Sequence, residues 1–342
     1  MTAWNAPSGA GPWTDPPATG LQDGPPGTAP RIMVIGASGF LGRHVAAAAT
    51  AAGLDVITAG RSAAPGAQLR LDLSSEPPAQ IAAVLAEQAP DVVVNCAGAT
   101  RGDIATLADA NITATAALVT ALRQTGRSIR LVHLGSAAEY GPSPPGEAVA
   151  ESAPARPASP YGAAKLAGTR LVELGRLTGL DAVVLRVFNP VGPGAPDSIL
   201  PGRVAAQLRQ AAADGGGLRL GPLDAVRDFV DARDVADAVL AAALAPSLPA
   251  AVINVGSGTG TPVRKMVAEL VSISGYDGSV TEGDNEAHQA SSGGQSGREG
   301  RAPGGPSWQQ ADISLAARDL RWQPRRDLPA ALAALWEDHH AA

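Results

Sequence analysis

The chain has 342 residues, a net charge of −6 at neutral pH and a single cysteine. Nucleic-acid binding rests on clustered Lys and Arg, so the acidic balance and the lack of a basic run argue against it. One cysteine allows no intramolecular disulfide, and no Cys/His cluster has the spacing of a metal site, which fits a reducing compartment. The length suits one large α/β domain, or a large domain with a smaller one.

Residues 1–30 are rich in proline and glycine and carry neither a basic segment nor an apolar core of the signal-peptide type. We interpret them as a disordered tail. No apolar run in the chain reaches the length of a membrane span. We therefore expect a cytoplasmic protein with no membrane partner.

Residues 31–42, RIMVIGASGFLG, predict a buried strand at 31–35, a glycine turn and a helix from residue 40. Gly36, Gly39 and Gly42 have the spacing of a pyrophosphate-binding turn. The first glycine permits the turn, the second lets the backbone approach the phosphates, and the third lets the helix pack on the strand. The anion would lie at the helix N-terminus. The predicted dinucleotide contacts here are Gly36, Ser38, Gly39, Phe40, Leu41 and Gly42.

The second predicted strand, 54–59, is followed by Gly60 and Arg61 rather than by an acidic residue. An acid at this place binds the ribose 2′-hydroxyl of NAD, whereas an arginine suits the 2′-phosphate of NADP. We therefore favour NADP(H) over NAD(H), with a solvated arginine as the alternative.

Two further predicted strands bring small or polar residues to the cofactor. A strand at 68–73 places Asp72 and Leu73 where an adenine could lie. A strand at 91–96 is followed by Ala97 and Gly98, whose small size lets the backbone approach a ligand. Cys96 is interpreted as a small buried hydrophobe beside them.

Strands and helices go on alternating to residue 188, which predicts an α/β fold with a Rossmann-type doubly wound parallel sheet. The remaining elements of this part are helices at 78–88, 104–125 and 161–178 and strands at 128–134 and 181–188. The pattern then changes, with helices at 200–213, 231–245 and 262–274, strands at 218–220, 228–230 and 252–255, and short helices around Leu315 and Ala331. We predict an NAD(P)-binding domain at 31–188 and a smaller α/β substrate lobe over most of 189–342. Residues 282–307, rich in Gly and Ser, are expected to be a flexible insertion.

Tyr161 and Lys165 are four residues apart at the start of a predicted helix, so they share one face. A phenol titrates near 10, and an adjacent ammonium would lower that pKa and ease proton exchange. Ser136 follows a predicted strand, where ligands bind in an open α/β sheet. We expect its hydroxyl to orient a carbonyl or an alcohol.

Several motifs in order resemble those of the extended short-chain dehydrogenase/reductases, the NAD(P)-dependent epimerase/dehydratase family. They are GASGFLG, DVVVNCAG, Asn111 in its helix, GSAAEYG, SPYGAAK, RVFNPVGPG, RDFVDARDVADAV, VINVGSG and DISLAARDLRWQP. The resemblance implies a catalytic set of Ser136, Tyr161, Lys165 and Asn111, with Tyr161 and Lys165 also contacting the cofactor. It further implies substrate contacts at Ser136, Ala137, Asn189 and Arg227. For Arg227 the alternative is a surface pair with Asp228.

Within this family, sugar-nucleotide 4,6-dehydratases carry adjacent acidic residues where this chain has Ala137 and Ala138, so the resemblance argues against dehydration. Glu139 stands one place later. A similar S-x-x-E-Y-G pattern occurs in GDP-4-keto-6-deoxymannose reductases, and the alternative for Glu139 is a solvated loop carboxylate.

We therefore predict an NAD(P)H-dependent ketoreductase that acts on the keto group of a nucleotide-linked 4-keto-6-deoxy sugar, in secondary-metabolite (antibiotic) or surface-sugar biosynthesis. The alternatives are an NAD-dependent sugar-nucleotide epimerase, a reductase of a polyketide-like ketone and a catalytically silent dinucleotide sensor. The expected partners are a small-molecule substrate and, by resemblance, a second copy of the chain. That copy would dock on the helices that contain Asn111 and Tyr161.

Overall fold

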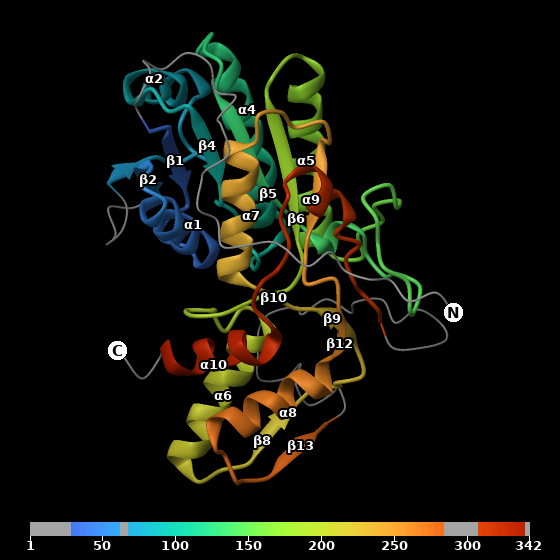
Figure 1. Cartoon of the computed structure of the whole chain (residues 1–342). Helices are drawn as coiled ribbons and strands as arrows, with labels where there is room; N and C mark the ends of the chain where they lie inside the picture. Colours follow the sequence, from blue (N-terminus) through green and yellow to red (C-terminus); the bar gives the residue numbers. More distant parts are fainter. Residues whose placement is uncertain (1–28, 62–67, 284–306, 339–342) are drawn as a thin grey trace.

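The computed structural model describes residues 29–61, 68–283 and 307–338 (Figure 1). Within these ranges the largest sheet has seven strands, all parallel, in the order β11-β6-β5-β4-β1-β2-β3. They are β1 (Arg31–Ile35), β2 (Asp55–Gly60), β3 (Leu69–Arg70), β4 (Val92–Asn95), β5 (Arg130–Ser136), β6 (Ala182–Val187) and β11 (Val252–Val255). The predicted doubly wound parallel sheet is confirmed.

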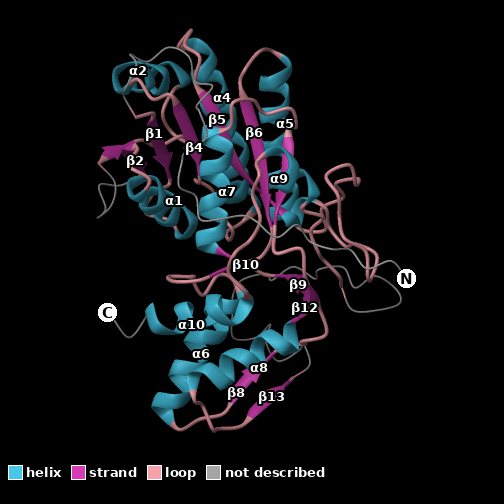
Figure 2. Ribbon diagram, viewed as in Figure 1, coloured by secondary structure: helices cyan, strands magenta, loops and turns pink. Residues whose placement is uncertain are grey.

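Helices cover both faces of this sheet (Figure 2). One face packs on α1 (Phe40–Ala51), α7 (Ala232–Leu244) and α9 (Ser314–Asp319), and the other on α2 (Pro78–Gln88), α4 (Ala114–Gln124) and α5 (Pro160–Leu177). Successive strand side chains point to opposite faces, so in β1 Val34 joins the first core and Met33 the second. Each such fully buried side chain contributes about 1.5–3 kcal/mol to stability.

A single long helix runs through α3 (Ile104–Ala108), a π-helical segment (Asp109–Thr113) and α4. By length and apolar composition it is the one helix among the described residues that could cross a membrane. Leu118 and Leu122 are fully buried against the sheet, however, and α4 contacts both α2 and α5. One face of this helix is therefore part of the core of the large unit.

The rest of the described chain forms a smaller unit below the sheet (Figure 1). Its helices are α6 (Leu200–Asp214), α8 (Val263–Ser274) and α10 (Leu328–Asp338), with the strands β8 (Leu218–Leu220) and β13 (Val280–Glu282). Leu208, Leu270 and Leu332 are fully buried in its core. Four short strands lie between the two units: β7 (Pro190–Val191), β9 (Val226–Asp228), β10 (Val230–Asp231) and β12 (Gly260–Pro262).

Several predicted elements differ from those observed. The strand predicted at 68–73 is only Leu69–Arg70, because the Asp72 carboxylate accepts the N–H of Ser74 and starts a turn. The strand predicted at 228–230 is divided at Phe229: β9 pairs with β12 on one side of it and β10 pairs with β7 on the other. Neither β7 nor β12 was expected.

The predicted division at residue 188 does not separate the units in space. Both α7 and β11 come from the 189–342 range and return to the large sheet. The substrate-binding role of the remaining lobe stays a prediction. Most of the predicted tail 1–30 and of the predicted insertion 282–307 lies outside the described residues.

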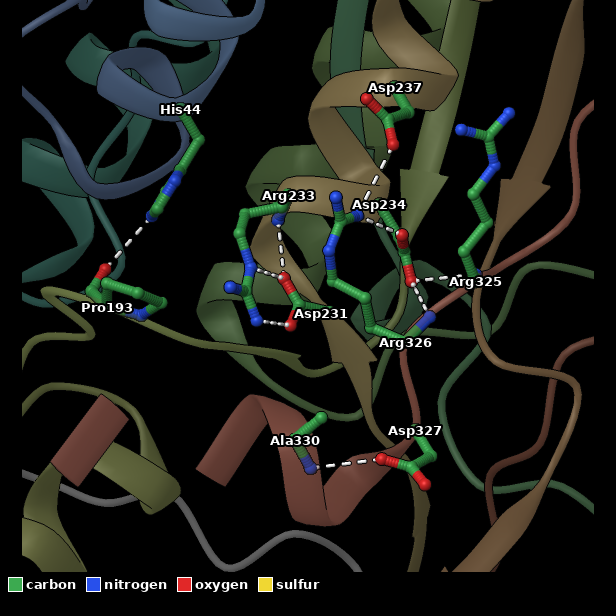
Figure 3. A network of polar contacts seen from close by, with 10 residues as sticks. All are labelled: His44, Pro193, Asp231, Arg233, Asp234, Asp237, Arg325, Arg326, Asp327 and Ala330. Carbon is green, nitrogen blue, oxygen red and sulfur yellow. Dashed lines mark hydrogen bonds and ion pairs between the residues drawn. The ribbon is translucent and has the colours of Figure 1, made fainter. Parts of the chain in front are cut away.

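Polar contacts join the two units beside α1 and α7 (Figure 3). His44 on α1 bonds through Nε2 to the carbonyl oxygen of Pro193 at 2.9 Å, and burial lowers the pKa of this imidazole. Buried Asp234 on α7 accepts the backbone N–H groups of Arg325 and Arg326, at 3.0 and 2.9 Å. The loop after β7 and the segment before α10 are thereby held against helices of the large sheet.

Arg130 provides a test of how α7 is held on the sheet. Its buried guanidinium donates to carbonyl oxygens at the C-terminal end of α7, including that of Ala243 at 3.2 Å, and pairs with Asp181 at 2.9 Å. Arg130→Met should lower the free energy of unfolding by about 2–4 kcal/mol, because those acceptors are left without a donor. Urea unfolding measures this. Exposed Arg123→Met should change it by less than about 0.5 kcal/mol, and an equal loss in both variants would contradict the assignment.

Candidate active site

The candidate site lies at the carboxyl edge of the large sheet. The chain leaves β1 toward β2 on one side and returns to β4 on the other, so a crevice opens where β1 and β4 end. Gly36 follows β1, Cys96 follows β4, and Ser136 is the last residue of β5. Residues far apart in sequence are therefore brought to one edge.

The glycine turn is packed too tightly for side chains. Gly36 has φ +80°, and a Cβ there would lie 2.8 Å from the backbone nitrogen of Ala97. A Cβ on Gly42 would lie 2.1 Å from the Gly36 carbonyl oxygen, so α1 starts directly against the turn. Among the described residues no side chain caps this end of α1, which leaves its first N–H groups for an anion. The cradle fits a dinucleotide pyrophosphate.

Ser136 and Tyr161 lie together. The Ser136 hydroxyl lowers the pKa of the Tyr161 phenol, while burial of the phenol raises that pKa by more. Ser136 Oγ also accepts the N–H of Ala138 at 3.2 Å, which leaves the hydroxyl hydrogen of Ser136 free to be donated. Tyr161 begins the first turn of α5, held by Pro160 at the N1 position and by the Ser159 cap.

Lys165 is buried one turn after Tyr161, and its ammonium donates to the Leu134 carbonyl oxygen at 2.5 Å. This bond ties α5 to β5 two residues before Ser136. The Cys96 thiol lies near the ammonium, yet burial dominates and raises the pKa of Cys96 to about 12. Cys96 packs partly buried against the first core, and its predicted contact with the cofactor stays a prediction.

The predicted lowering of the Tyr161 pKa by Lys165 is wrong for this structure. Burial raises the pKa of the Tyr161 phenol, and the negative charge of Glu139 raises it further. Lys165 donates to a backbone carbonyl instead, and burial lowers the pKa of its own ammonium. At neutral pH Tyr161 is therefore a phenol and a proton donor.

Asn111 lies in the π-helical segment and is buried. Its amide Nδ2 donates to the carbonyl oxygens of Ala99 and Leu107, each at 2.9 Å. Its buried Oδ1 has no hydrogen-bond partner among the described residues and lies 2.7 Å from where a Gly98 Cβ would be. Asn111 thus supports the loop after β4, and its predicted catalytic role stays a prediction.

The other predicted cofactor residues surround the glycine turn. Arg61 follows β2 directly and is exposed. Asp72 is half-buried at the turn after β3, and Leu73 is buried beside it. Ser38, Phe40 and Leu41 lie in the turn and the start of α1. These positions fit an elongated dinucleotide along the carboxyl ends of β1, β2 and β3.

The predicted substrate residues lie on the side of the smaller unit. Ala137 is buried directly after Ser136, and the Asn189 amide donates to the Asp228 carbonyl oxygen at 2.9 Å. The half-buried guanidinium of Arg227 donates to the Ser307 carbonyl and hydroxyl oxygens, both at 3.0 Å.

The surface pair weighed for Arg227 and Asp228 is wrong. Asp228 is fully buried, and its carboxylate accepts the N–H groups of Ser257, Gly258 and Ala311. It therefore joins the loop after β11 to the segment before α9 and has no exposed surface for an ion pair.

Gln309 escaped sequence reasoning at the site, and so did the burial of Glu139. Gln309 donates from Nε2 to the Ala137 carbonyl oxygen at 2.9 Å, which brings the C-terminal segment to the loop after β5. Glu139 is buried and ion-paired with Arg186, so the solvated carboxylate weighed for it is wrong. The S-x-x-E capping-box spacing could have indicated the second of these. Among the described residues, no group of three His, Cys, Asp or Glu side chains could hold a metal ion.

Comparisons with known proteins agree with this geometry. A model of the NAD dependent epimerase/dehydratase family matches residues 32–256. The chain is 41% identical over 327 residues to the dTDP-6-deoxy-L-talose 4-dehydrogenase (NAD(P)(+)) of Kitasatospora kifunensis, covering 91% of this chain and 96% of that protein. It is 32% identical over 259 residues to the GDP-6-deoxy-D-mannose reductase of Pseudomonas aeruginosa, covering 71% and 80% respectively. The structure of RMD from Pseudomonas aeruginosa complexed with NADPH has a TM-score of 0.75 at 25% identity, covering 92% of this chain and 100% of that one. The resemblance drawn from the motifs is confirmed.

Tyr161→Phe tests the proton donor. The variant should lose about 100- to 10 000-fold in kcat and still bind NADPH, because only the hydroxyl is removed. Steady-state kinetics and a cofactor titration measure the two effects. Tyr276→Phe removes the same group on the smaller unit and should keep full activity. Unchanged turnover in Tyr161→Phe would contradict the assignment.

Proposed function

The chain belongs to the NAD dependent epimerase/dehydratase family, and on that premise we propose that it is an NAD(P)H-dependent ketoreductase of a nucleotide-linked 4-keto-6-deoxy sugar. It is an enzyme of the extended short-chain dehydrogenase/reductase type, and its cofactor is NAD(P). The observation that carries the proposal is the position of the Tyr161 phenol beside Ser136, at the carboxyl end of β5, with Lys165 one turn further along α5.

The glycine turn at Gly36, Gly39 and Gly42 would hold the cofactor pyrophosphate, and the chemistry that NAD(P)H would supply when bound is the hydride that reduces the ketone. Tyr161 gives its proton to the ketone oxygen, and burial, which raises its pKa, keeps this donor protonated at neutral pH. Ser136 donates its free hydroxyl hydrogen to the same oxygen and orients the carbonyl. Lys165, one turn after Tyr161 and held by the Leu134 carbonyl, would donate to the nicotinamide ribose of a bound cofactor.

The residues beside Ser136 argue against dehydration. Ala137 and Ala138 stand where dehydratases of this family carry acidic residues, and an alanine side chain moves no proton. Glu139, the nearest carboxylate, is buried and already bonded to Arg186 and Thr169. The similar proteins named as a 4-dehydrogenase and a reductase of 6-deoxy sugars support an oxidoreductase with a 6-deoxy-sugar substrate.

We also propose that the enzyme prefers NADPH to NADH. Arg61 follows β2 directly, where an acidic residue would favour the 2′-hydroxyl of NAD. Its exposed guanidinium suits the 2′-phosphate of NADP(H), which supports NADPH as the reductant.

We also propose where the enzyme acts, in which kind of pathway, and with which partner. A cytoplasmic enzyme of secondary-metabolite or surface-sugar biosynthesis accords with its lone cysteine and with the proposed substrate. A homodimer is supported by Leu174 and Leu177 on α5, which are 58% and 82% exposed.

The first test is a reaction assay. Purified protein given NADPH and a nucleotide-linked 4-keto-6-deoxy sugar should oxidise the cofactor stoichiometrically with alcohol product, and denatured protein should release little nucleotide. Absorbance of NADPH and mass spectrometry of the sugar measure both. NAD⁺ retained stoichiometrically, with conversion of a sugar nucleotide to its epimer, would support the epimerase instead.

The second test concerns Arg61. Arg61→Ala should weaken NADPH binding by about 10- to 100-fold and leave NADH binding unchanged, because only the contact to the 2′-phosphate is lost. Fluorescence titration with each cofactor measures the dissociation constants. Exposed Arg219→Ala on β8 is the matched control. If Arg61→Ala weakened the binding of NADPH and NADH equally, Arg61 would not contact the 2′-phosphate.

A further inference from the structure

Glu139 lies beneath the candidate active site with no exposed surface. Its carboxylate accepts the backbone N–H of Ser136 at 2.8 Å and the hydroxyl of Thr169 at 2.9 Å, and it pairs with Arg186 Nε at 2.7 Å. These partners come from the end of β5, from α5 and from β6. One carboxylate thus joins the elements that carry Ser136, Tyr161 and Lys165.

The local sequence turns this carboxylate back toward Ser136. Residues Ala137–Glu139 form a short 3₁₀ helix with a capping box: Ser136 Oγ accepts the Ala138 N–H, and the Glu139 carboxylate accepts the Ser136 N–H. A Cβ on Gly135 would lie 2.7 Å from Glu139 Oε1, so glycine leaves the room that the carboxylate occupies. In the G-S-x-x-E sequence, the glycine therefore leaves room for the Glu139 carboxylate, and that carboxylate fixes the backbone N–H of Ser136.

The hydrogen bond from Thr169 to Glu139 connects the Ser136 backbone to helix α5 as well. Tyr161, Lys165 and Thr169 are spaced by four residues, which places them along one face of the helix. Thr169 is fully buried and donates to Glu139 Oε2. The catalytic face of α5 is therefore bonded to the loop that carries Ser136.

Arg186 is the charged partner of the buried Glu139 carboxylate. Its guanidinium pairs with Glu139 and lies 4.5 Å over the Tyr140 ring, whose hydroxyl donates to Asn254 Oδ1 at 2.7 Å. Because Glu139 is fully buried and bonded to a cation and to two further donors, it does not reach a substrate. Its negative charge acts on the two titrating groups of the site, and it raises the pKa of both Tyr161 and Lys165.

We propose that Glu139 is a positioning residue of this enzyme: it fixes the Ser136 backbone, holds the Tyr161 face of α5 through Thr169, and keeps a negative charge near the proton donor. Its kinetic consequences rest on the proposed ketoreductase function. The charge disfavours the phenolate that Tyr161 becomes when it gives up its proton, so it raises the pH at which Tyr161 deprotonates.

Two substitutions separate the hydrogen bond from the charge. Glu139→Gln keeps an oxygen that accepts the Ser136 N–H but removes the charge, whereas Glu139→Ala removes both. We expect kcat for ketone reduction to fall by about 10-fold in the first and about 100-fold in the second, with KM for NADPH unchanged. In both, the decline of kcat/KM with rising pH should begin about one pH unit lower, because loss of the negative charge eases deprotonation of Tyr161.

Two further variants control for folding and for general charge effects. Glu173→Gln removes a carboxylate on α5 that lies about 18 Å along the helix from Tyr161, and it should keep the wild-type pH profile. Glu139→Gln combined with Arg186→Met removes both buried ions, so it avoids an unpaired Arg186 and should fold while still showing the pH shift.

A titration without substrate makes the inference independent of the proposed reaction. The phenolate absorbance of the protein, minus that of its Tyr161→Phe counterpart, reports Tyr161 alone, and circular dichroism marks the pH range in which the fold persists. Tyr161 should titrate at lower pH in Glu139→Gln than in the wild type. If the variants unfold at lower urea concentration but keep the wild-type titration and pH profile, Glu139 is only structural and the proposal is overturned. If the titration shifts while no keto sugar is reduced, the proposed function fails and the role of Glu139 stands.

Discussion

The common carboxyl edge of the parallel sheet is the constraint on which the site depends. Strands β1, β4, β5 and β6 run side by side in one direction, with Ile35 paired to Asn95 and Ser136 paired to Val187. The residues that follow these strands therefore meet, although a hundred residues separate Gly36 from Ser136. Because the strands are buried on both faces, any shift in register would expose apolar side chains, so the edge is well defined.

Polar groups buried at this edge fix its geometry. The Lys165 ammonium donates to the Leu134 carbonyl, and Glu139 bonds the Ser136 N–H while pairing with Arg186. Removing two charges from water is costly, and such pairs contribute little net stability compared with apolar packing. Their contribution here is directional, since each hydrogen bond sets the position of one group relative to another. This explains why charged residues occupy space that aliphatic side chains could fill.

The smaller unit is tied to the same edge by contacts from several parts of the chain. The Asp228 carboxylate accepts N–H groups from the loop after β11 and from the segment before α9. Gln309 donates to the Ala137 carbonyl oxygen. On the other side His44 bonds the loop after β7 (Figure 3). Cofactor-side and substrate-side residues are therefore parts of one bonded framework, with Asn189 and Arg227 on its substrate side.

The sequence by itself determined the features that depend on near neighbours. The glycine turn, the helix Pro78–Gln88 and the four-residue spacing of Tyr161 and Lys165 follow from backbone sterics and helical periodicity, which act within a few residues. Only the tertiary structure decided the partner of Glu139, 47 residues away in Arg186, and the raised pKa of Tyr161. Burial and charge proximity arise from contacts between distant segments, so no local pattern encodes them.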